Sequence, residues 1–391
     1  RGLIRPILMM ILVCLSGIFI GLLFYPNFFV EKSKHIIDAW NVAKNFPVRI
    51  TLIHEGKRIL STDTPSNYLF KYILLTYPIV ILSGLSLFAI FLKSILKNNS
   101  IYILLFIIFI AFFPIFYIII SDANIYNGWR HITFHYPPMV ILSSIGIYTL
   151  IKKVESHKYL RTSIVIILVI LIAKPFIWMV ENHPYSYVYF NELTGKNRGF
   201  KEFDTDYQQL GASESYNKLV EYLRSNESEN IKFPVTLYTN NEAMIYQEKI
   251  PEDSLKIVIG GFSGYSIVDW DYAIFSSIYL DPKLYSYTFP PKGEILHEVD
   301  IHKYPINFLI RRENKFDRIG INYLNKKDLN NAYSYLTEAY NYDNNNYRVW
   351  VPLAYCCLSR QESQNAKLLL TNYLSLFPGD KQATTLLENT N

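Results

Sequence analysis

The sequence predicts a multi-pass α-helical membrane protein, followed by a small extracytoplasmic α/β domain and a C-terminal pair of α-helical hairpins. Hydrophobic residues make up 50% of the 391 residues and charged residues only 18%, whereas soluble domains carry about 25% charge. The first half of the chain contains long apolar runs. The second half alternates strand-like and helix-like segments and ends in a repeat.

Five stretches are long and apolar enough to form membrane-spanning helices, which need about 20 residues. They lie at about residues 6–25, 70–92, 101–120, 134–151 and 162–180. The third carries no charge, and Pro137–Pro138 suits the start of the fourth helix. We therefore expect a transmembrane domain over residues 1–184.

Basic residues in the short connections predict the orientation of these helices, because Lys and Arg concentrate on the cytoplasmic side. Three connections that must share one side are all basic, through Arg1, Arg5, Lys93, Lys97, Lys152, Lys153, Lys158 and Arg161. The loops 26–69 and 121–133, and everything after about residue 181, are then outside. We expect a protein of the bacterial inner or plasma membrane whose C-terminal half is extracytoplasmic.

Charge and cysteine content exclude several other classes. The net charge is only +5, and no dense basic patch is present, so we expect a lipid bilayer and no nucleic acid as partner. Cys14 and the adjacent Cys356 and Cys357 are the three cysteines. They form neither a disulfide framework nor a zinc-binding spacing.

The segment after the last span predicts a small α/β domain over residues 185–312. A helical pattern occupies about 213–226, and strand-like runs lie at 234–240, 255–261, 272–280 and 306–312.

Residues 313–391 contain an internal repeat with a period of 34 residues. One set is Phe316, Ile319, Gly320, Tyr323, Ala332, Leu336 and Ala339; the second is Trp350, Leu353, Ala354, Cys357, Ala366, Leu370 and Tyr373. This period and pattern resemble tetratricopeptide repeats, which bind peptides in a concave face and imply a protein partner. A plain helical hairpin of no repeat family is the alternative.

The stretch SDANIYNGWRHITFHYPP, residues 121–138, carries the most informative residues. Arg130 lies before a predicted helix start, where free N–H groups and a guanidinium favour an anion. We expect Arg130, His131 and Tyr126 to bind a lipid phosphate. The alternative is an interfacial loop anchored by Trp129 and Tyr126, with Arg130 reaching the headgroups.

The same stretch contains two histidines with a spacing of four residues. His131 and His135 would share a face of a helix and could bind a metal, but the proline pair argues against a continuous helix. We therefore assign no metal ligands and no certain cofactor, and leave a divalent metal open.

Four segments in order resemble bacterial glycosyltransferases of the dolichyl-phosphate-mannose mannosyltransferase-like superfamily. They are STDTPSNYLFKYILLTYP (61–78), YNGWRHITFHYPP (126–138), HPYSYVYFNELTG (183–195) and FDTDYQQLGAS (203–213). Ser66 stands where the family has Trp, and Gln208–Gln209 replaces a Trp-Gly pair. The resemblance covers roughly residues 20–312.

This resemblance implies transfer of a sugar, with inversion, from a polyprenyl-phosphate donor on the extracytoplasmic side. It implies a carboxylate base in a first outer loop, which we expect before Arg1, so no catalytic base is named here. Arg130 is the candidate to stabilise the departing phosphate.

Other outward-facing polar residues are weaker candidates. His54, Glu55 and Lys57 lie in a long outer loop of a kind that covers the active site in the resembled family. Asp63 and Asp122 are candidates for the same active-site loop. Solvated or capping roles suit these two carboxylates, and also Asp204 and Asp206, better than the role of a catalytic base.

Two other functions compete with the glycosyltransferase. One is a non-catalytic membrane scaffold that recruits an envelope partner through its repeats. The other is a lipid-carrier flippase or polymerase, which should show charges in mid-span. Lys174 lies near a span end, and almost no other charge falls inside a span.

Overall fold

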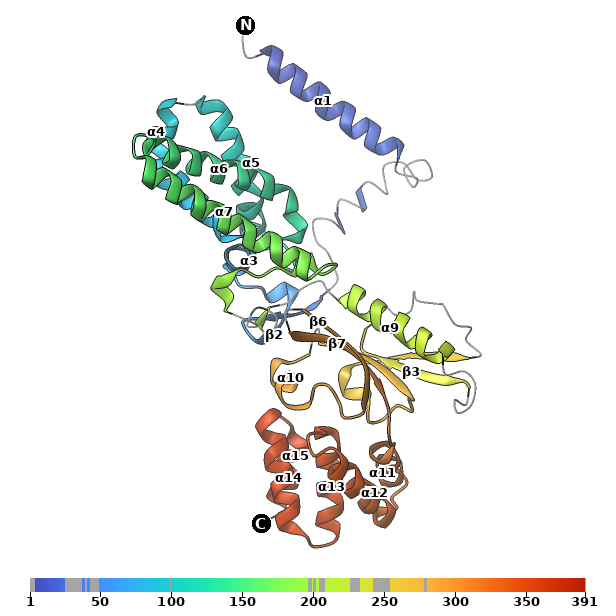
Figure 1. The fold of residues 1–391 in the computed structure, drawn as a ribbon. Helices are drawn as coiled ribbons and strands as arrows, with labels where there is room; N and C mark the ends of the chain where they lie inside the picture. Colours follow the sequence, from blue (N-terminus) through green and yellow to red (C-terminus); the bar gives the residue numbers. More distant parts are fainter. Residues whose placement is uncertain are drawn as a thin grey trace.

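The computed structural model describes most of the chain and arranges it in three parts. The described residues are 4–24, 37–38, 41–42, 49–98, 100–195, 199, 202–203, 208–225, 233–241, 254–277, 280–301 and 303–390. Apolar helices come first, a five-stranded sheet follows, and a set of short helices ends the chain (Figure 1).

Four helical stretches of the described chain are long and apolar enough to cross a membrane. They are Ile79–Lys97, Ile101–Ile120, Arg130–Lys153 and Lys158–Glu181. They correspond to α4 (Ile79–Asn98), α5 (Ile101–Ile120), α6 (Tyr136–Lys153) and α7 (Lys158–Glu181). Four of the five expected spans thus have helices of suitable length and composition.

The first expected span, near residues 6–25, is also helical. It forms α1, Ile4–Leu23, but its apolar stretch in the described chain, Ile11–Gly21, is shorter than the other four. In Figure 1, α1 lies apart from the helices α4–α7.

The second expected span, 70–92, is wrong as a single helix. The structure has α3, Tyr68–Thr76, and then α4, with an extended Tyr77 between them. Pro78 suits the break, because proline disfavours helical backbone in the residue before it, here Tyr77, and has no N–H to donate to the carbonyl of Leu74. The candidate span accordingly begins at Ile79.

Helices α4 and α6 pack through small residues. A Cβ on Gly146 would lie 2.3 Å from the carbonyl oxygen of Gly84 and 2.4 Å from the backbone nitrogen of Phe88. A Cβ on Gly84 would lie 1.9 Å from Ser143 Oγ. Small residues let two helix backbones approach this closely.

The long loop before α3 contains a β-hairpin that the sequence reading missed. Strands β1, Thr51–His54, and β2, Lys57–Leu60, pair antiparallel. Glu55 and Gly56 form the turn with positive φ. The hairpin contacts a later segment, because the backbone N–H of Gly56 donates to the carbonyl of Glu202 and His54 bridges to Phe203.

The sheet has the strand order β4-β3-β5-β7-β6. Strands β3 (Val235–Thr239), β4 (Leu255–Ile259) and β5 (Tyr272–Ser276) are parallel. Strand β7, Tyr304–Arg311, runs antiparallel to β5 and to the edge strand β6, Glu294–Ile301. The sequence reading missed β6, whose apolar and polar residues alternate around a bulge.

Each face of the sheet is covered by helices. Helix α9, Gln208–Ser225, packs on one face through Tyr216, Leu219 and Leu223. It begins before the expected helix at 213. The other face, with Phe275 and Phe308, shares a core with helix α10, Pro282–Thr288, and with the C-terminal helices.

Five short helices end the chain. They are α11 (Phe316–Asn325), α12 (Leu329–Tyr342), α13 (Tyr347–Ser359), α14 (Ser363–Leu376) and α15 (Lys381–Glu388). Residues paired by the repeat are buried alike: Ala332 with Ala366, and Leu336 with Leu370. Gly320 has the corresponding close contact, since its Cβ would lie 2.7 Å from Leu336 Cγ.

Two contacts fix the sheet to its neighbours. Tyr185 and Val188, just after α7, pack with Val299 and Ile301 of β6. At the other end, the guanidinium of Arg312 lies 4.6 Å from the ring centre of Trp270 and is ion-paired with Asp317 of α11.

Replacement of Gly146 by Ala should loosen the packing of α4 on α6. The added methyl meets backbone atoms that cannot rotate away, and overpacking costs about 1–3 kcal/mol. We expect a lower midpoint of thermal unfolding for Gly146→Ala in detergent micelles. Gly17→Ala in α1, where a Cβ meets nothing within 4 Å, is the control. A midpoint of Gly146→Ala equal to that of the wild type would refute the close packing of α4 on α6.

Candidate functional site

A pocket of about 910 Å³ opens at the end of α5, where the chain turns toward α6. Its wall combines the last turns of α5, the following loop and the 3-10 helix η2, Arg130–His135. The lining residues are Val42, Phe113, Pro114, Tyr117, Ile118, Ala123, Asn124, Ile125, Tyr126, Arg130, His131, Ile132 and Phe134. This volume is typical of small-molecule sites, which measure about 300–1,000 Å³.

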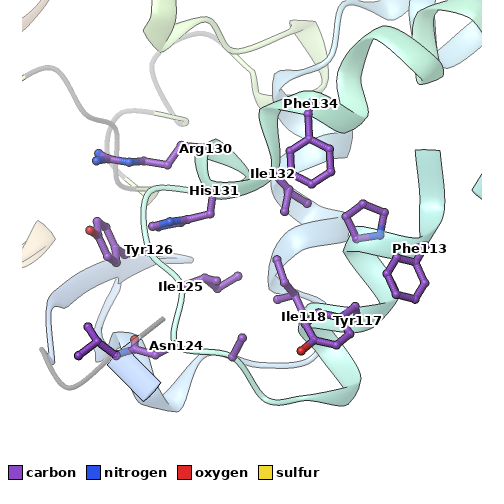
Figure 2. Close-up of a pocket in the computed structure, with 13 residues that line it drawn as sticks. Phe113, Tyr117, Ile118, Asn124, Ile125, Tyr126, Arg130, His131, Ile132 and Phe134 are labelled. Carbon is purple, nitrogen blue, oxygen red and sulfur yellow. The ribbon is translucent and has the colours of Figure 1, made fainter. Parts of the chain in front are cut away.

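The three residues expected to bind a phosphate lie together in this wall. The guanidinium of Arg130 is 5.2 Å from the ring centre of Tyr126, and His131 meets the same ring edge-on at 4.7 Å. Figure 2 shows the three side chains on one side of the pocket. Among the described lining residues, Arg130 carries a permanent positive charge, and its planar guanidinium is suited to bind an anion such as phosphate.

The opposite side of the pocket is apolar. Phe113, Tyr117 and Phe134 face it there (Figure 2), and Ile125 and Ile132 lie between the two sides. All three aromatic rings are half exposed. The pocket therefore suits an amphipathic ligand with an anionic group and an apolar part.

The loop before η2 is tied to α3 at Gly128. The backbone N–H of Gly128 donates to Tyr68 Oη at 3.0 Å. Gly128 has φ +66°, and a Cβ there would lie 2.6 Å from the ring of Tyr72. Only glycine satisfies both the backbone conformation and this close approach.

Two further hydrogen bonds hold η2 at its ends. At the start, Trp129 Nε1–H donates to Thr76 Oγ1 at 2.8 Å. At the end, Tyr77 Oη and His135 Nε2 are 2.7 Å apart, and His135 Nδ1 bonds the carbonyl of Ile132. Since a carbonyl only accepts, Nδ1 carries the proton and Nε2 accepts from the tyrosine hydroxyl. The segment Arg130–Phe134 is thus fixed between two anchors.

The expectation that a helix N-terminus supplies free N–H groups is wrong at α6. Pro137 and Pro138 occupy its first turn and have no N–H, and the N–H of Tyr136 donates to the carbonyl of Thr133. Attraction of an anion must therefore come from Arg130 itself.

The two histidines weighed as metal ligands have different surroundings. His135 is completely buried and uses both ring nitrogens, whereas His131 lines the pocket. Within the described ranges, no group of three or more metal-ligating side chains occurs.

The other predicted site residues do not line the pocket. Glu55 is ion-paired with Lys71, and Lys57 is exposed at the start of β2. Asp63 accepts from Thr62 Oγ1, and Asp122 is an exposed turn residue with φ 48°. Asp204 and Asp206 lie outside the described residues.

His54 is buried under the hairpin rather than exposed in a loop. Its ring is 5.2 Å from Tyr68 and 5.5 Å from Phe203. Burial, with a smaller contribution from Lys71, lowers its pKa from 6.5 to about 4. The ring is therefore neutral near pH 7 and packs as an aromatic residue against Tyr68, Tyr72 and Phe203.

The sequence reading missed the residues that hold the pocket: Thr76, Tyr77, Gly128 and the post-span residue Asn191. Two signals were available. Pro78 lies inside an expected span, and Asn191 lies in the segment 183–195 that resembles the glycosyltransferases.

Comparison with known proteins finds no matching family model, curated protein or solved structure.

Protonation of His54 should destabilise the folded chain. Because the folded pKa of about 4 lies below the unfolded value, the unfolded chain binds the extra proton between these two values. The free energy of unfolding that depends on the neutral ring is fully present above about pH 6.5. It is lost as the pH falls toward 4, by at most about 1.4 kcal/mol per pH unit.

Thermal unfolding between pH 4 and 7 checks this expectation. The midpoint of His54→Phe should fall less with acid than that of the wild type, whereas exposed His157→Phe should follow the wild type. Parallel curves for wild type and His54→Phe would contradict the assignment.

Proposed function

We propose that this chain is part of an integral membrane glycosyltransferase. It moves a sugar from a polyprenyl-phosphate donor to an acceptor on the extracytoplasmic side of a bacterial membrane. The pocket between Arg130 and the apolar end of α5 receives the donor's phosphate and the first part of its lipid.

One observation supports this proposal: three of the segments that resemble the glycosyltransferases pack together and hold the loop that carries Arg130. Tyr68 and Thr76 come from 61–78, and they bond Gly128 and Trp129 of 126–138. Phe203, from the fourth segment, packs on Tyr72 at 5.4 Å. These contacts from distant parts of the chain fix the loop and η2, which form the polar side of the pocket.

The chemistry of donor cleavage suits this pocket. A departing polyprenyl phosphate gains negative charge, and a fixed guanidinium nearby stabilises that charge. The ring of Tyr126 holds Arg130 in place and reduces the reorganisation needed. The catalytic carboxylate is not assigned to the described residues; we propose that another part of the full protein supplies it.

The membrane part of the proposal rests on the four apolar helices. Their basic ends, such as Lys97 in the last turn of α4 and Lys152 in the last turn of α6, are proposed to face the cytoplasm. The pocket, the sheet and the C-terminal helices then share the outer compartment.

The alternative is a scaffold that uses tetratricopeptide-like helices to recruit an envelope partner. Equivalent burial of Ala332 and Ala366 favours a true repeat, and Tyr355 and Leu368 are exposed on α13 and α14. A scaffold requires no sugar turnover, so the next experiment separates the two proposals.

Arg130→Ala in the full-length protein should lower consumption of a radiolabelled polyprenyl-phosphate sugar by isolated membranes. Loss of one preorganised charge contact typically lowers turnover by roughly 100-fold or more. Arg130→Lys keeps the charge without the planar guanidinium, so its turnover should lie between those of the wild type and Arg130→Ala. Arg161→Ala, an exposed cation in α7, is the control; unchanged turnover and donor affinity in Arg130→Ala would remove the phosphate assignment.

A reporter fused after Asn391 tests the proposed topology. A periplasmic reporter such as an alkaline phosphatase should be active there and inactive when inserted at Glu155, between α6 and α7. The reverse result would invert the orientation and end the extracytoplasmic proposal.

A further inference from the structure

The break between α3 and α4 leaves backbone carbonyls without helical partners. The carbonyl of Leu74 would normally accept from the N–H of residue 78, which is a proline. The backbone is extended at Tyr77, so the carbonyls of Leu75 and Tyr77 also leave the regular helical pattern. Such groups need partners when they are buried.

Asn191, from the segment after α7, supplies these partners. Its side-chain Nδ2 donates to the carbonyls of both Leu74 and Tyr77 at 2.7 Å, and its backbone N–H donates to the carbonyl of Leu75 at 2.8 Å. The residue is 2% exposed.

The segment that carries Asn191 is itself anchored. The Oδ1 of Asn191 accepts from the N–H of Leu193 at 2.9 Å. The adjacent Glu192 is ion-paired at 3.2 Å with Lys174 of α7. The segment with Asn191 therefore links α7 to the break between α3 and α4.

The two residues at the break are those that hold the pocket. Thr76 accepts from the indole of Trp129, directly before Arg130. Tyr77 bonds His135, at the end of η2, and meets the Trp129 ring edge-on at 5.5 Å. The shape of the break thus decides where Trp129 and His135 lie, and with them the segment Arg130–Phe134.

We infer that Asn191 is a positioning residue for Arg130. It acts from a remote part of the chain by fixing the α3–α4 break on which Trp129 and His135 depend. The inference rests on the proposed binding of an anionic amphiphile in the pocket. Asn191 itself does not line that pocket.

Asn191→Asp tests the inference with nearly unchanged size. The carboxylate cannot donate to Leu74 and Tyr77, whereas it still accepts from Leu193. Asn182→Asp is the matched control, since Asn182 Nδ2 also donates to a helix-end carbonyl, that of Trp178 at 2.8 Å.

Two measurements on the purified chain in detergent are needed. The first is the NMR signal of the Trp129 indole N–H, identified by its loss in Trp129→Phe; it requires no ligand. The second is the dissociation constant of farnesyl phosphate for wild type, Arg130→Ala, Asn191→Asp and the double variant.

The inference predicts that Asn191→Asp shifts the indole signal and weakens farnesyl phosphate by about 10-fold or more. The loss should not multiply with that of Arg130→Ala, because both changes remove one interaction. Asn182→Asp should change neither measurement.

A lowered unfolding midpoint with an unchanged indole signal and affinity would overturn the inference and leave Asn191 a purely structural cap. Independent losses in the double variant would overturn it as well. If the wild type does not bind farnesyl phosphate, the proposed pocket ligand is wrong, and the indole signal alone then decides on the positioning role.

Two milder variants cover a failure of Asn191→Asp to fold. Asn191→Ser keeps one side-chain donor. Thr76→Val removes the hydroxyl that accepts from the Trp129 indole N–H. Both are expected to shift the indole signal and weaken farnesyl phosphate. If both variants fold and neither measurement changes, the inference is overturned.

Discussion

The missing N–H of Pro78 is the constraint around which the candidate site is organised. An uninterrupted helix would satisfy its own backbone and would direct Thr76 and Tyr77 like any other helical residues. The break at Pro78, with its extended Tyr77, instead frees several carbonyls, and the Tyr77 hydroxyl meets His135. A buried polar group must be paired, so the break requires a partner from elsewhere, and the segment after α7 provides it. The break between α3 and α4 therefore brings three distant parts of the chain together.

The pocket that results has two chemically different sides. On one side, the ring of Tyr126 contacts two polar side chains: Arg130 lies over its face, and His131 meets it edge-on. Across from them, Phe113 and Phe134 present only apolar surface. Such an arrangement suits a ligand that is itself divided, with charge at one end and hydrocarbon at the other. This match is the physical reason for preferring a lipid phosphate over a small soluble anion.

Much of the helical part of the fold could be read from composition, because uninterrupted apolar runs such as 101–120 have few other structures available. The phosphate candidates also could be named, since Arg130 and His131 stand beside an aromatic residue in one short stretch. The hairpin at 51–60 could not, because His54 reads as a polar loop residue and is neutral and buried only in its aromatic surroundings. Asn191 was equally hidden: its role depends on carbonyls more than 100 positions away, and no local pattern specifies that contact.

The shared core between the sheet and the last helices bears on how the chain is divided. Phe275 and Phe308 of the sheet belong to the same buried cluster as Ala354 and Leu370 of the repeat. Arg312, stacked on Trp270, continues this contact to α11. The terminal helices are therefore a wall of the sheet's interior rather than an appendage. A chain shortened at residue 312 would expose the buried face of the sheet to water. A ligand that binds the last helices would therefore also stabilise the strands that pack against them.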